Sequence, residues 1–265
     1  MSIEKSLRTK RGLILAFFAY LIQFPVLLGG MQGWFPIHPV IIFPPLLGLI
    51  NAKIEKRGLE GLGLILPHPL RSLLLALILA LPLSVSFVHI FALDRIAFSF
   101  PGIDIIVFFD LLKDFAIAVF IIAMWEEFVS RGYIQTRLQE VWGFIGVSLS
   151  AVMFATLHIP SAVFEFKYEP QMVLLNFFEM LVPGFMLSMI YWKTRSTLTT
   201  IAVHGFRNFI FAVAMEYSGL GARETHLIHP VVQILWRSCE VLVALLLLRL
   251  LFPDEGKSGA REQAA

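Results

Sequence analysis

Long apolar runs recur along this chain and constrain its fold more than any motif does. The first run extends from Gly12 to Gly30 without a charged residue. Of all residues, 58% are hydrophobic and only 15% are charged, and 25 are Phe. A soluble domain has roughly 25% charged residues and could not bury this much apolar surface in its core. The composition therefore predicts an all-α integral membrane protein.

Eight transmembrane helices are predicted when the apolar runs are divided into spans of roughly 20 residues. They cover residues 12–30, 34–51, 72–93, 112–139, 141–165, 172–192, 197–217 and 231–252. The second span should be kinked or broken by its prolines, Pro36, Pro39, Pro44 and Pro45. Residues 96–111 are expected in the membrane interface. We expect residues 1–252 to form a single transmembrane domain and residues 253–265 to form a disordered polar tail.

The distribution of basic residues predicts the orientation. If the N-terminus is cytosolic and the spans alternate, the cytosolic side holds fifteen of the 21 Lys and Arg residues, and the opposite side holds four. The other two, Arg207 and Arg237, lie within spans. Because basic residues accumulate in cytosolic loops, this asymmetry favours eight spans with both termini in the cytosol. A seven-span arrangement would lose the asymmetry over half of the chain.

Three short polar motifs interrupt the apolar spans. Ionisable side chains in hydrocarbon are costly, so each of them is a candidate for function. The first motif extends from Trp125 to Arg131. In it, Glu127 and Arg131 are four residues apart and share one helix face, so Arg131 can hold Glu127 in place. Glu126 points about 100° away from them and can serve another role. The alternative is a surface ion pair at the cytosolic end of a helix.

The other two motifs each contain a histidine. Phe154 and His158 lie on one face of the fifth predicted span, and His204 and Asn208 lie on one face of the seventh. Between the latter two, Gly205 permits a close approach of another segment. The alternatives are a packed, hydrogen-bonded His158 and a polar contact between helices at His204 and Asn208.

Helix geometry relates the first two motifs. Glu126 lies sixteen residues before Trp142, and His158 lies sixteen residues after it. If the fourth and fifth spans form an antiparallel hairpin that turns near Trp142 and Gly143, both side chains lie about 24 Å from the turn.

The depth of His204 agrees with this level if the hairpin projects roughly 10 Å into the cytosol. Charged residues near the turn favour such a projection, namely Arg131, Arg137 and Glu140. We therefore predict that the three motifs meet in one site that opens toward the cytosolic side.

This set contains the groups that a hydrolase needs. Glu126 and His158 can hold and deprotonate a water molecule. His204 and Asn208 can donate hydrogen bonds to a developing oxyanion. A zinc alternative uses Glu126, His158 and His204 as ligands and leaves a fourth position for water. The chain contains neither His-Glu-x-x-His nor Gly-x-Ser-x-Gly, the motifs of common zinc peptidases and serine hydrolases.

The three motifs together resemble those of the CPBP family, the CAAX proteases and bacteriocin-processing proteins. They read Glu126-Glu127-x-x-x-Arg131, Phe154-x-x-x-His158 and His204-x-x-x-Asn208, and the resemblance covers roughly residues 112–217, the predicted catalytic core. It implies an intramembrane endopeptidase that cleaves near the C-terminus of prenylated, CAAX-type or otherwise membrane-anchored substrates.

The resemblance also implies a role for each motif residue. Glu126 activates water together with His158, while His204 and Asn208 stabilise the oxyanion. Glu127 and Arg131 support the site. The prenyl-endopeptidase branch implies a glutamate-dependent enzyme without a bound metal, with zinc as the alternative.

The expected partners are a prenylated or lipid-anchored protein or peptide and the bilayer. A net charge of +2 without a basic cluster gives no indication of nucleic-acid binding. The rival interpretation is a non-catalytic membrane binding protein or transporter that uses the same pocket, although the sequence shows no internal repeat typical of transporters.

Further charged residues lie within the predicted spans. Glu179 and Arg207 are expected to pair with each other, or Arg207 with Glu216. Arg237 and Glu240 are three residues apart and are expected to satisfy each other.

Overall fold

The computed structural model describes residues 3–32, 42–92, 105–217 and 230–253. These residues form helices and loops without a β-strand among them, which confirms the predicted all-α class for this part of the chain. The helices are α1 Ile3–Met31, α2 Phe43–Leu49, η2 Ile50–Ile54, η3 Leu59–Leu62, α3 Pro69–Ala92, α4 Ile105–Ala116, η4 Ile117–Ala123, α5 Met124–Glu127, η5 Phe128–Gln135, α6 Thr136–Trp142, α7 Phe144–Thr156, η6 Ser161–Glu165, α8 Pro170–Thr194, α9 Thr197–Tyr217 and α10 Pro230–Leu251.

Several boundaries follow from proline chemistry. Helices α3, α8 and α10 begin at Pro69, Pro170 and Pro230, where the missing N–H leaves no donor unsatisfied. In the described part of the predicted second span, Pro44 and Pro45 likewise lie at the start of a helix, in the first turn of α2. Pro36 and Pro39, and most of the predicted interfacial segment, lie outside the described residues. Its described part, 105–111, is the start of α4.

Residues 105–142 form a long helix in which five segments follow one another without an intervening loop. The predicted span 112–139 is therefore longer at both ends. Two π-helical segments, Ile117–Ala123 and Phe128–Gln135, enclose the α-helical turn Met124–Glu127. π-Helical turns are rare and frequently occur at functional sites. Here they flank the turn that carries Glu126 and Glu127.

The predicted hairpin at Trp142 and Gly143 is confirmed. The long helix ends at Trp142, and Gly143 reverses the chain with a φ of 55°, which favours glycine. Gly146 then allows α7 to return closely, since a Cβ there would lie 2.4 Å from the backbone of Leu138. The charges near this turn behave differently from the prediction. Arg131 and Arg137 are buried within the protein, so they do not support a projection into the cytosol.

A polar network between the hairpin and an earlier part of the chain holds Arg137 in place. Its guanidinium donates to Oδ1 of Asn51 at 2.7 Å and to the carbonyl oxygen of Gly61 at 2.7 Å, and it also contacts the carboxylate of Glu55. Nearby, Arg57 donates to Oε2 of Glu140 at 2.8 Å. These contacts fix the segment between α2 and α3 against α6.

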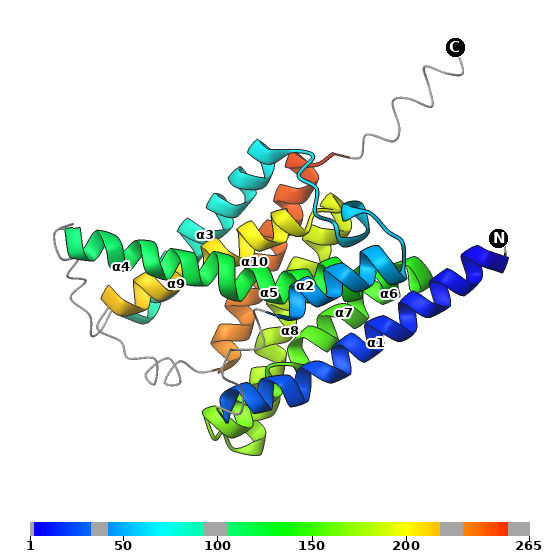
Figure 1. Cartoon of the computed structure of the whole chain (residues 1–265). Coiled ribbons are helices and arrows are strands. Elements are labelled where there is room, and N and C mark those ends of the chain that lie inside the picture. Colours follow the sequence, from blue (N-terminus) through cyan, green and yellow to red (C-terminus); the bar gives the residue numbers. More distant parts are fainter. Residues whose placement is uncertain (1–2, 33–41, 93–104, 218–229, 254–265) are drawn as a thin grey trace, which may run out of the picture.

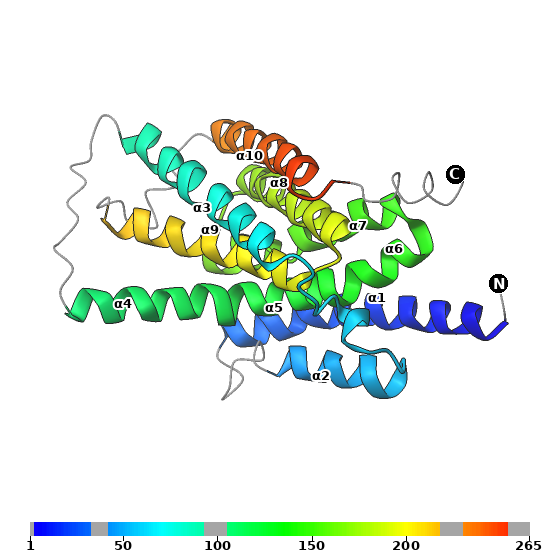
Figure 2. The same ribbon diagram turned by 90° about the horizontal axis from the view of Figure 1, so that it is seen from above.

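The helices pack in an order that brings the polar motifs together. Helix α9 lies between α3 and the long helix, and α8 lies between α7 and α10 (Figures 1 and 2). Gly205 permits the close approach of α9 to the long helix, because a Cβ at this position would lie 2.8 Å from Cα of Val119. The predicted seventh span, 197–217, has the bounds of α9.

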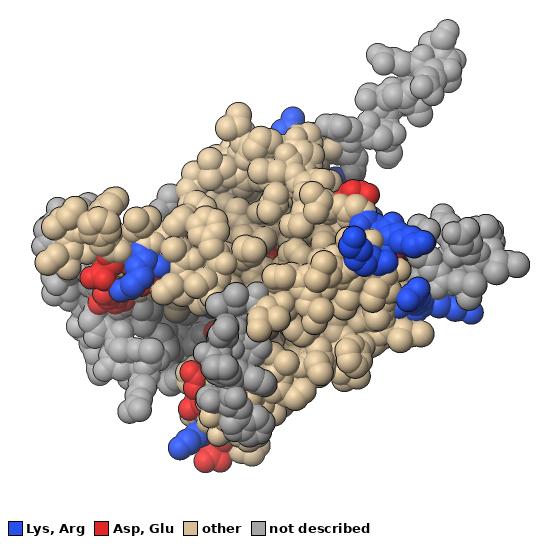
Figure 3. All heavy atoms as spheres, viewed as in Figure 1, with Lys and Arg blue, Asp and Glu red and all other residues tan. Residues whose placement is uncertain are grey.

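The surface is consistent with a membrane environment. Three helical segments in the described part are long and apolar enough to cross a membrane: Thr9–Met31, Phe144–Glu165 and Pro170–Thr194. Figure 3 shows a broad face with few charges, and Lys and Arg side chains gather at the end where the N-terminus lies. Large apolar side chains such as Phe18, Ile106 and Leu242 are more than 60% exposed, which is costly in water and ordinary in lipid.

Candidate active site

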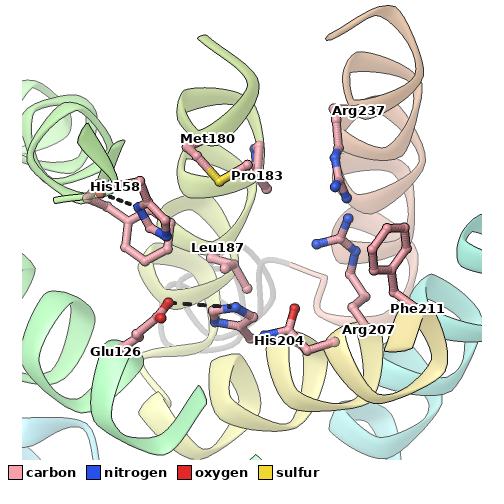
Figure 4. Close-up of a pocket in the computed structure, with 11 residues that line it drawn as sticks. Glu126, His158, Met180, Pro183, Leu187, His204, Arg207, Phe211 and Arg237 are labelled. Carbon is pink, nitrogen blue, oxygen red and sulfur yellow. Dashed lines mark hydrogen bonds and ion pairs between the residues drawn. The ribbon is translucent and has the colours of Figure 1, made fainter. Parts of the chain in front are cut away.

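The three polar motifs meet at one cavity. Its volume is about 220 Å³, larger than the space that one water molecule needs. The long helix, the end of α7, and α8, α9 and α10 contribute its lining: Glu126, Phe154, His158, Met180, Pro183, Leu187, His204, Arg207, Asn208, Phe211 and Arg237 (Figure 4). The structure thus brings together Glu126, His158, His204 and Asn208 at one cavity; the hairpin geometry predicts this for Glu126 and His158.

The adjacent carboxylates Glu126 and Glu127 have different surroundings, as their helical offset predicts. The side chain of Glu127 is 0% exposed and forms an ion pair with Arg131, whose NH1 lies 3.1 Å from Oε1. The Glu126 side chain is 18% exposed and lines the cavity. Glu126 is therefore accessible to a ligand or water, while Glu127 is enclosed by protein.

His204 lies between these two carboxylates. Its Nδ1 is 2.8 Å from Oε1 of Glu127, and its Nε2 is 3.8 Å from Oε2 of Glu126. Because an ionised carboxylate only accepts hydrogen bonds, Nδ1 donates to Glu127. In the imidazolium form, Nε2 also carries a proton and can donate into the cavity. This arrangement fixes the ring orientation and directs Nε2 toward Glu126.

The aromatic ring of Phe154 connects the second and third motifs. The guanidinium of Arg131 lies over this ring at 4.2 Å from its centroid, and the ring centroid of His158 lies 4.8 Å away. His204 approaches the same ring at 6.2 Å. Gly184 leaves room for Phe154, since a Cβ there would lie 2.9 Å from Cδ1 of the ring. Phe154 is therefore a packing centre for the whole site.

Backbone contacts orient His158 and Arg131. Nδ1 of His158 is 3.0 Å from the carbonyl oxygen of Phe154, which can only accept a hydrogen bond. In the neutral ring, Nε2 of His158 is then an acceptor available to a water molecule. Arg131 donates from NH2 to the carbonyl oxygen of Gly184 at 2.9 Å, so α8 also helps to position the pair formed with Glu127.

The zinc alternative can be tested on the arrangement of the ligands. In the described ranges, no group of three or more His, Cys, Asp and Glu side chains could hold a metal ion. Glu126, His158 and His204 line one cavity without forming such a set.

The charged residues beyond the motifs pair differently from the prediction. Arg207 donates to Oε2 of Glu240 at 2.6 Å, and Glu179 lies 3.8 Å from Arg237. The expected pairs Glu179–Arg207 and Arg207–Glu216 are therefore wrong, because α10 supplies the counterions. The predicted contact of Arg237 with Glu240 is confirmed at 3.7 Å.

Sequence reasoning also missed part of the cavity lining. Arg207 and Arg237 were assigned to structural ion pairs, yet both face the cavity. Met180, Pro183 and Leu187 line it from α8. The spacing of these last three at three or four residues places them on one helix face, and this was the only signal available for them.

A known protein family matches the part of the chain that carries the three motifs. The family model described as Type II CAAX prenyl endopeptidase Rce1-like matches residues 108–210. No curated protein and no solved structure matches the chain. Together with the apolar helices, the family match points to a protease that is an integral membrane protein. Residues 108–210, which contain all three motifs, are therefore similar to the type II CAAX prenyl endopeptidase Rce1-like family, in agreement with the resemblance of the motifs.

Proposed function

We propose that this protein is an intramembrane endopeptidase that hydrolyses a peptide bond near the C-terminus of a prenylated, CAAX-type or otherwise membrane-anchored substrate. The observation that carries the proposal is the position of His204 between Glu127, 2.8 Å from Nδ1, and Glu126, 3.8 Å from Nε2. An oriented histidine beside an accessible carboxylate, in one cavity, is an arrangement suited to water activation and oxyanion stabilisation.

In the proposed reaction, Glu126 accepts a proton from a water molecule that His158 holds through its Nε2. The resulting hydroxide oxygen attacks the carbonyl carbon of the scissile amide. His204 and Asn208 donate hydrogen bonds to the carbonyl oxygen as it becomes an oxyanion. The C–N bond then breaks, and the proton held by Glu126 passes to the leaving amine nitrogen. One water molecule is consumed, and a carboxylic acid and an amine are formed. The acid then gives its proton to the amine, which yields a carboxylate and an ammonium group.

Glu127 and Arg131 support this chemistry without contacting the substrate. Both side chains are 0% exposed, and neither lines the cavity. We propose that Glu127 keeps the ring of His204 in one orientation, while Arg131 fixes Glu127 and packs on Phe154. They are positioning residues.

The membrane arrangement is part of the proposal. We infer eight spans with both termini in the cytosol and an active site that opens toward the cytosolic side. The Lys and Arg side chains at the end where the N-terminus lies support this orientation (Figure 3). An opening on that side would admit the C-terminus of a cytosolic protein whose lipid anchor lies in the same leaflet.

The test is the cleavage of a farnesylated CAAX peptide by the purified, detergent-solubilised protein. Wild type should cleave it, whereas Glu126→Gln and His158→Ala should lose activity by at least about 10²-fold. Glu165→Gln is the matched control, since this carboxylate is exposed and lies outside the cavity. A strong chelator should leave the wild-type rate unchanged.

The other outcomes are equally informative. If the chelator abolishes cleavage and zinc restores it, the glutamate mechanism is replaced by a metal-dependent one. If the folded protein cleaves no lipidated peptide but binds it, the non-catalytic binding protein replaces the enzyme.

A further inference from the structure

Two guanidinium groups lie on the wall of the candidate active site. Arg207 comes from α9 and Arg237 from α10, and both line the cavity together with Glu126 (Figure 4). Their carboxylate partners, Glu240 and Glu179, are not among the lining residues. A ligand in the cavity would therefore meet two cations on this wall, whose counterions are not part of the lining.

The ion pairs fix the two arginines differently. Arg207 is 7% exposed and donates to the buried carboxylate of Glu240 at 2.6 Å, the length of a strong charge-assisted hydrogen bond. Arg237 is 16% exposed and is shared between two carboxylates, with Glu240 at 3.7 Å and Glu179 at 3.8 Å. Arg207 is thus an anchored part of the wall, and Arg237 is the more accessible of the two.

The positions of the charges in Figure 4 separate the cavity into two ends. Glu126 and His158 lie at one end, and the side chains of Arg207 and Arg237 point toward each other at the other end. The attraction between charges is stronger at a largely buried site than in water, so an anion should bind at the arginine end and avoid Glu126. The guanidinium fork fits a carboxylate in a bidentate manner.

The length of the cavity limits which carboxylate can bind. Along α9 it extends from His204 to Phe211, seven residues or about 10 Å at 1.5 Å per residue. An extended peptide of three residues covers a similar length, about 10 Å. Between the two ends, Met180, Pro183 and Leu187 of α8 provide an apolar wall for side chains.

We propose that Arg237, supported by Arg207, binds the free α-carboxylate at the C-terminus of the substrate. The site would then recognise the C-terminus of the substrate at one end of the cavity, while the scissile bond lies at the Glu126 end. This inference rests on the proposed endopeptidase function. It identifies Arg237 as a residue that determines specificity, a role separate from the water chemistry at Glu126.

The experiment compares two farnesylated peptides that differ only at the C-terminus, one with a free carboxylate and one with a primary amide. Wild type should cleave the acid with a kcat/KM at least roughly tenfold higher than the amide, as expected for a charged hydrogen bond. Arg237→Gln should remove this preference, so that the acid and the amide are cleaved with similar kcat/KM. Arg249→Gln is the matched control, because Arg249 lies exposed on the same helix.

A second variant should change the preference for the acid over the amide in the opposite direction. Glu179→Gln removes a carboxylate that competes for Arg237, so the preference for the acid should rise several-fold. This variant keeps the guanidinium and the shape of the residue at 179, and thermal unfolding checks that both variants are folded. Equal cleavage of acid and amide by wild type would overturn the inference and leave the endopeptidase intact.

The experiment gives a different result if the protein is not an endopeptidase. If wild type cleaves neither peptide, the binding of the same two peptides still tests the arginine site. Tighter binding of the acid, lost in Arg237→Gln, would support a carboxylate site in a non-catalytic protein. Equal binding of acid and amide would overturn it there as well.

Discussion

Nδ1 of His204 lies 2.8 Å from Oε1 of Glu127, and this contact determines which ring nitrogen faces the cavity. The same carboxylate oxygen lies 3.1 Å from NH1 of Arg131. One buried oxygen therefore joins a residue of the long helix to the histidine of α9. The orientation of His204 depends on a group that no substrate touches.

Replacement of Glu127 by Gln should test this dependence. The variant keeps the size of the side chain but removes the charge that faces His204 and Arg131. We expect kcat to fall on the order of 10²-fold, because a neutral amide holds the Nδ1–H of His204 less strongly than a carboxylate does. The free energy of unfolding should fall by about 3–5 kcal/mol, the usual cost of breaking a buried ion pair. Steady-state cleavage and thermal unfolding measure the two effects.

A double variant separates orientation from stability. Glu127→Gln combined with Arg131→Met removes both charges, and such replacements often restore stability. We expect stability to recover and kcat to stay low. Recovery of both would show that Glu127 is needed only for folding.

Gly184→Ala should disturb the site from α8. Its Cβ would lie 2.9 Å from Cδ1 of Phe154 and 3.3 Å from the carbonyl oxygen of Ala151, so the ring must move. Because this ring contacts Arg131 and His158, we expect a roughly tenfold or greater loss of kcat/KM. Peptide cleavage measures the effect.

Gly48→Ala is the matched control for this substitution. Gly48 lies in α2, where a Cβ would meet nothing within 4 Å. Alanine there should leave the cleavage rate unchanged and can stabilise the helix by up to about 1 kcal/mol. If both glycine variants retain full activity, catalysis does not depend on the position of the Phe154 ring.

Much of this site could be predicted because its signals are local. An i,i+4 spacing fixes a shared helix face, so the pair of Glu127 and Arg131 and the outward direction of Glu126 follow from helix geometry. The fourth and fifth predicted spans adjoin near Gly143, so a hairpin could be assumed there, and the equal distances of Glu126 and His158 to the turn then follow from the helix rise. These features need no knowledge of which helices are neighbours.

The ion pairs of α10 could not be predicted in the same way. Pairing Arg207 with Glu240 requires that α10 packs on the face of α9 that carries Arg207, and apolar spans give little information on which helix faces meet. The burial of Arg137 was missed for the same reason. Its partners Asn51 and Glu55 lie more than 80 residues earlier in the chain. Charge alone suggested a solvated turn.

Arg137→Ala should affect stability and not the chemistry. Arg137 is 1% exposed, forms hydrogen bonds with Asn51 and Gly61, and pairs with Glu55. It lies outside the cavity. Its loss leaves the buried Glu55 without this cation, which should cost about 3–5 kcal/mol in unfolding free energy. The kcat of the folded protein should change less than twofold.

Arg57→Ala serves as the comparison, because its pair with Glu140 is more exposed, at 15% and 36% of the two side chains. An exposed ion pair contributes only about 0–1 kcal/mol. Similar losses of thermal stability in the two variants would contradict the structural role assigned to Arg137.

The eight-span topology predicts that Lys53 and Glu169 lie on opposite sides of the membrane. Both are exposed, Lys53 in η2 and Glu169 immediately before α8. Cys239 is the single cysteine of the chain, so Cys239→Ser provides a background free of thiols in which Lys53→Cys and Glu169→Cys can be compared. A thiol reagent that cannot cross the membrane should label Lys53→Cys only from the cytosolic side and Glu169→Cys only from the other. In the eight-span topology, three spans separate the two positions, so they must face opposite sides of the membrane. Labelling of both from one side would contradict this topology and, with it, the proposed cytosolic opening of the active site.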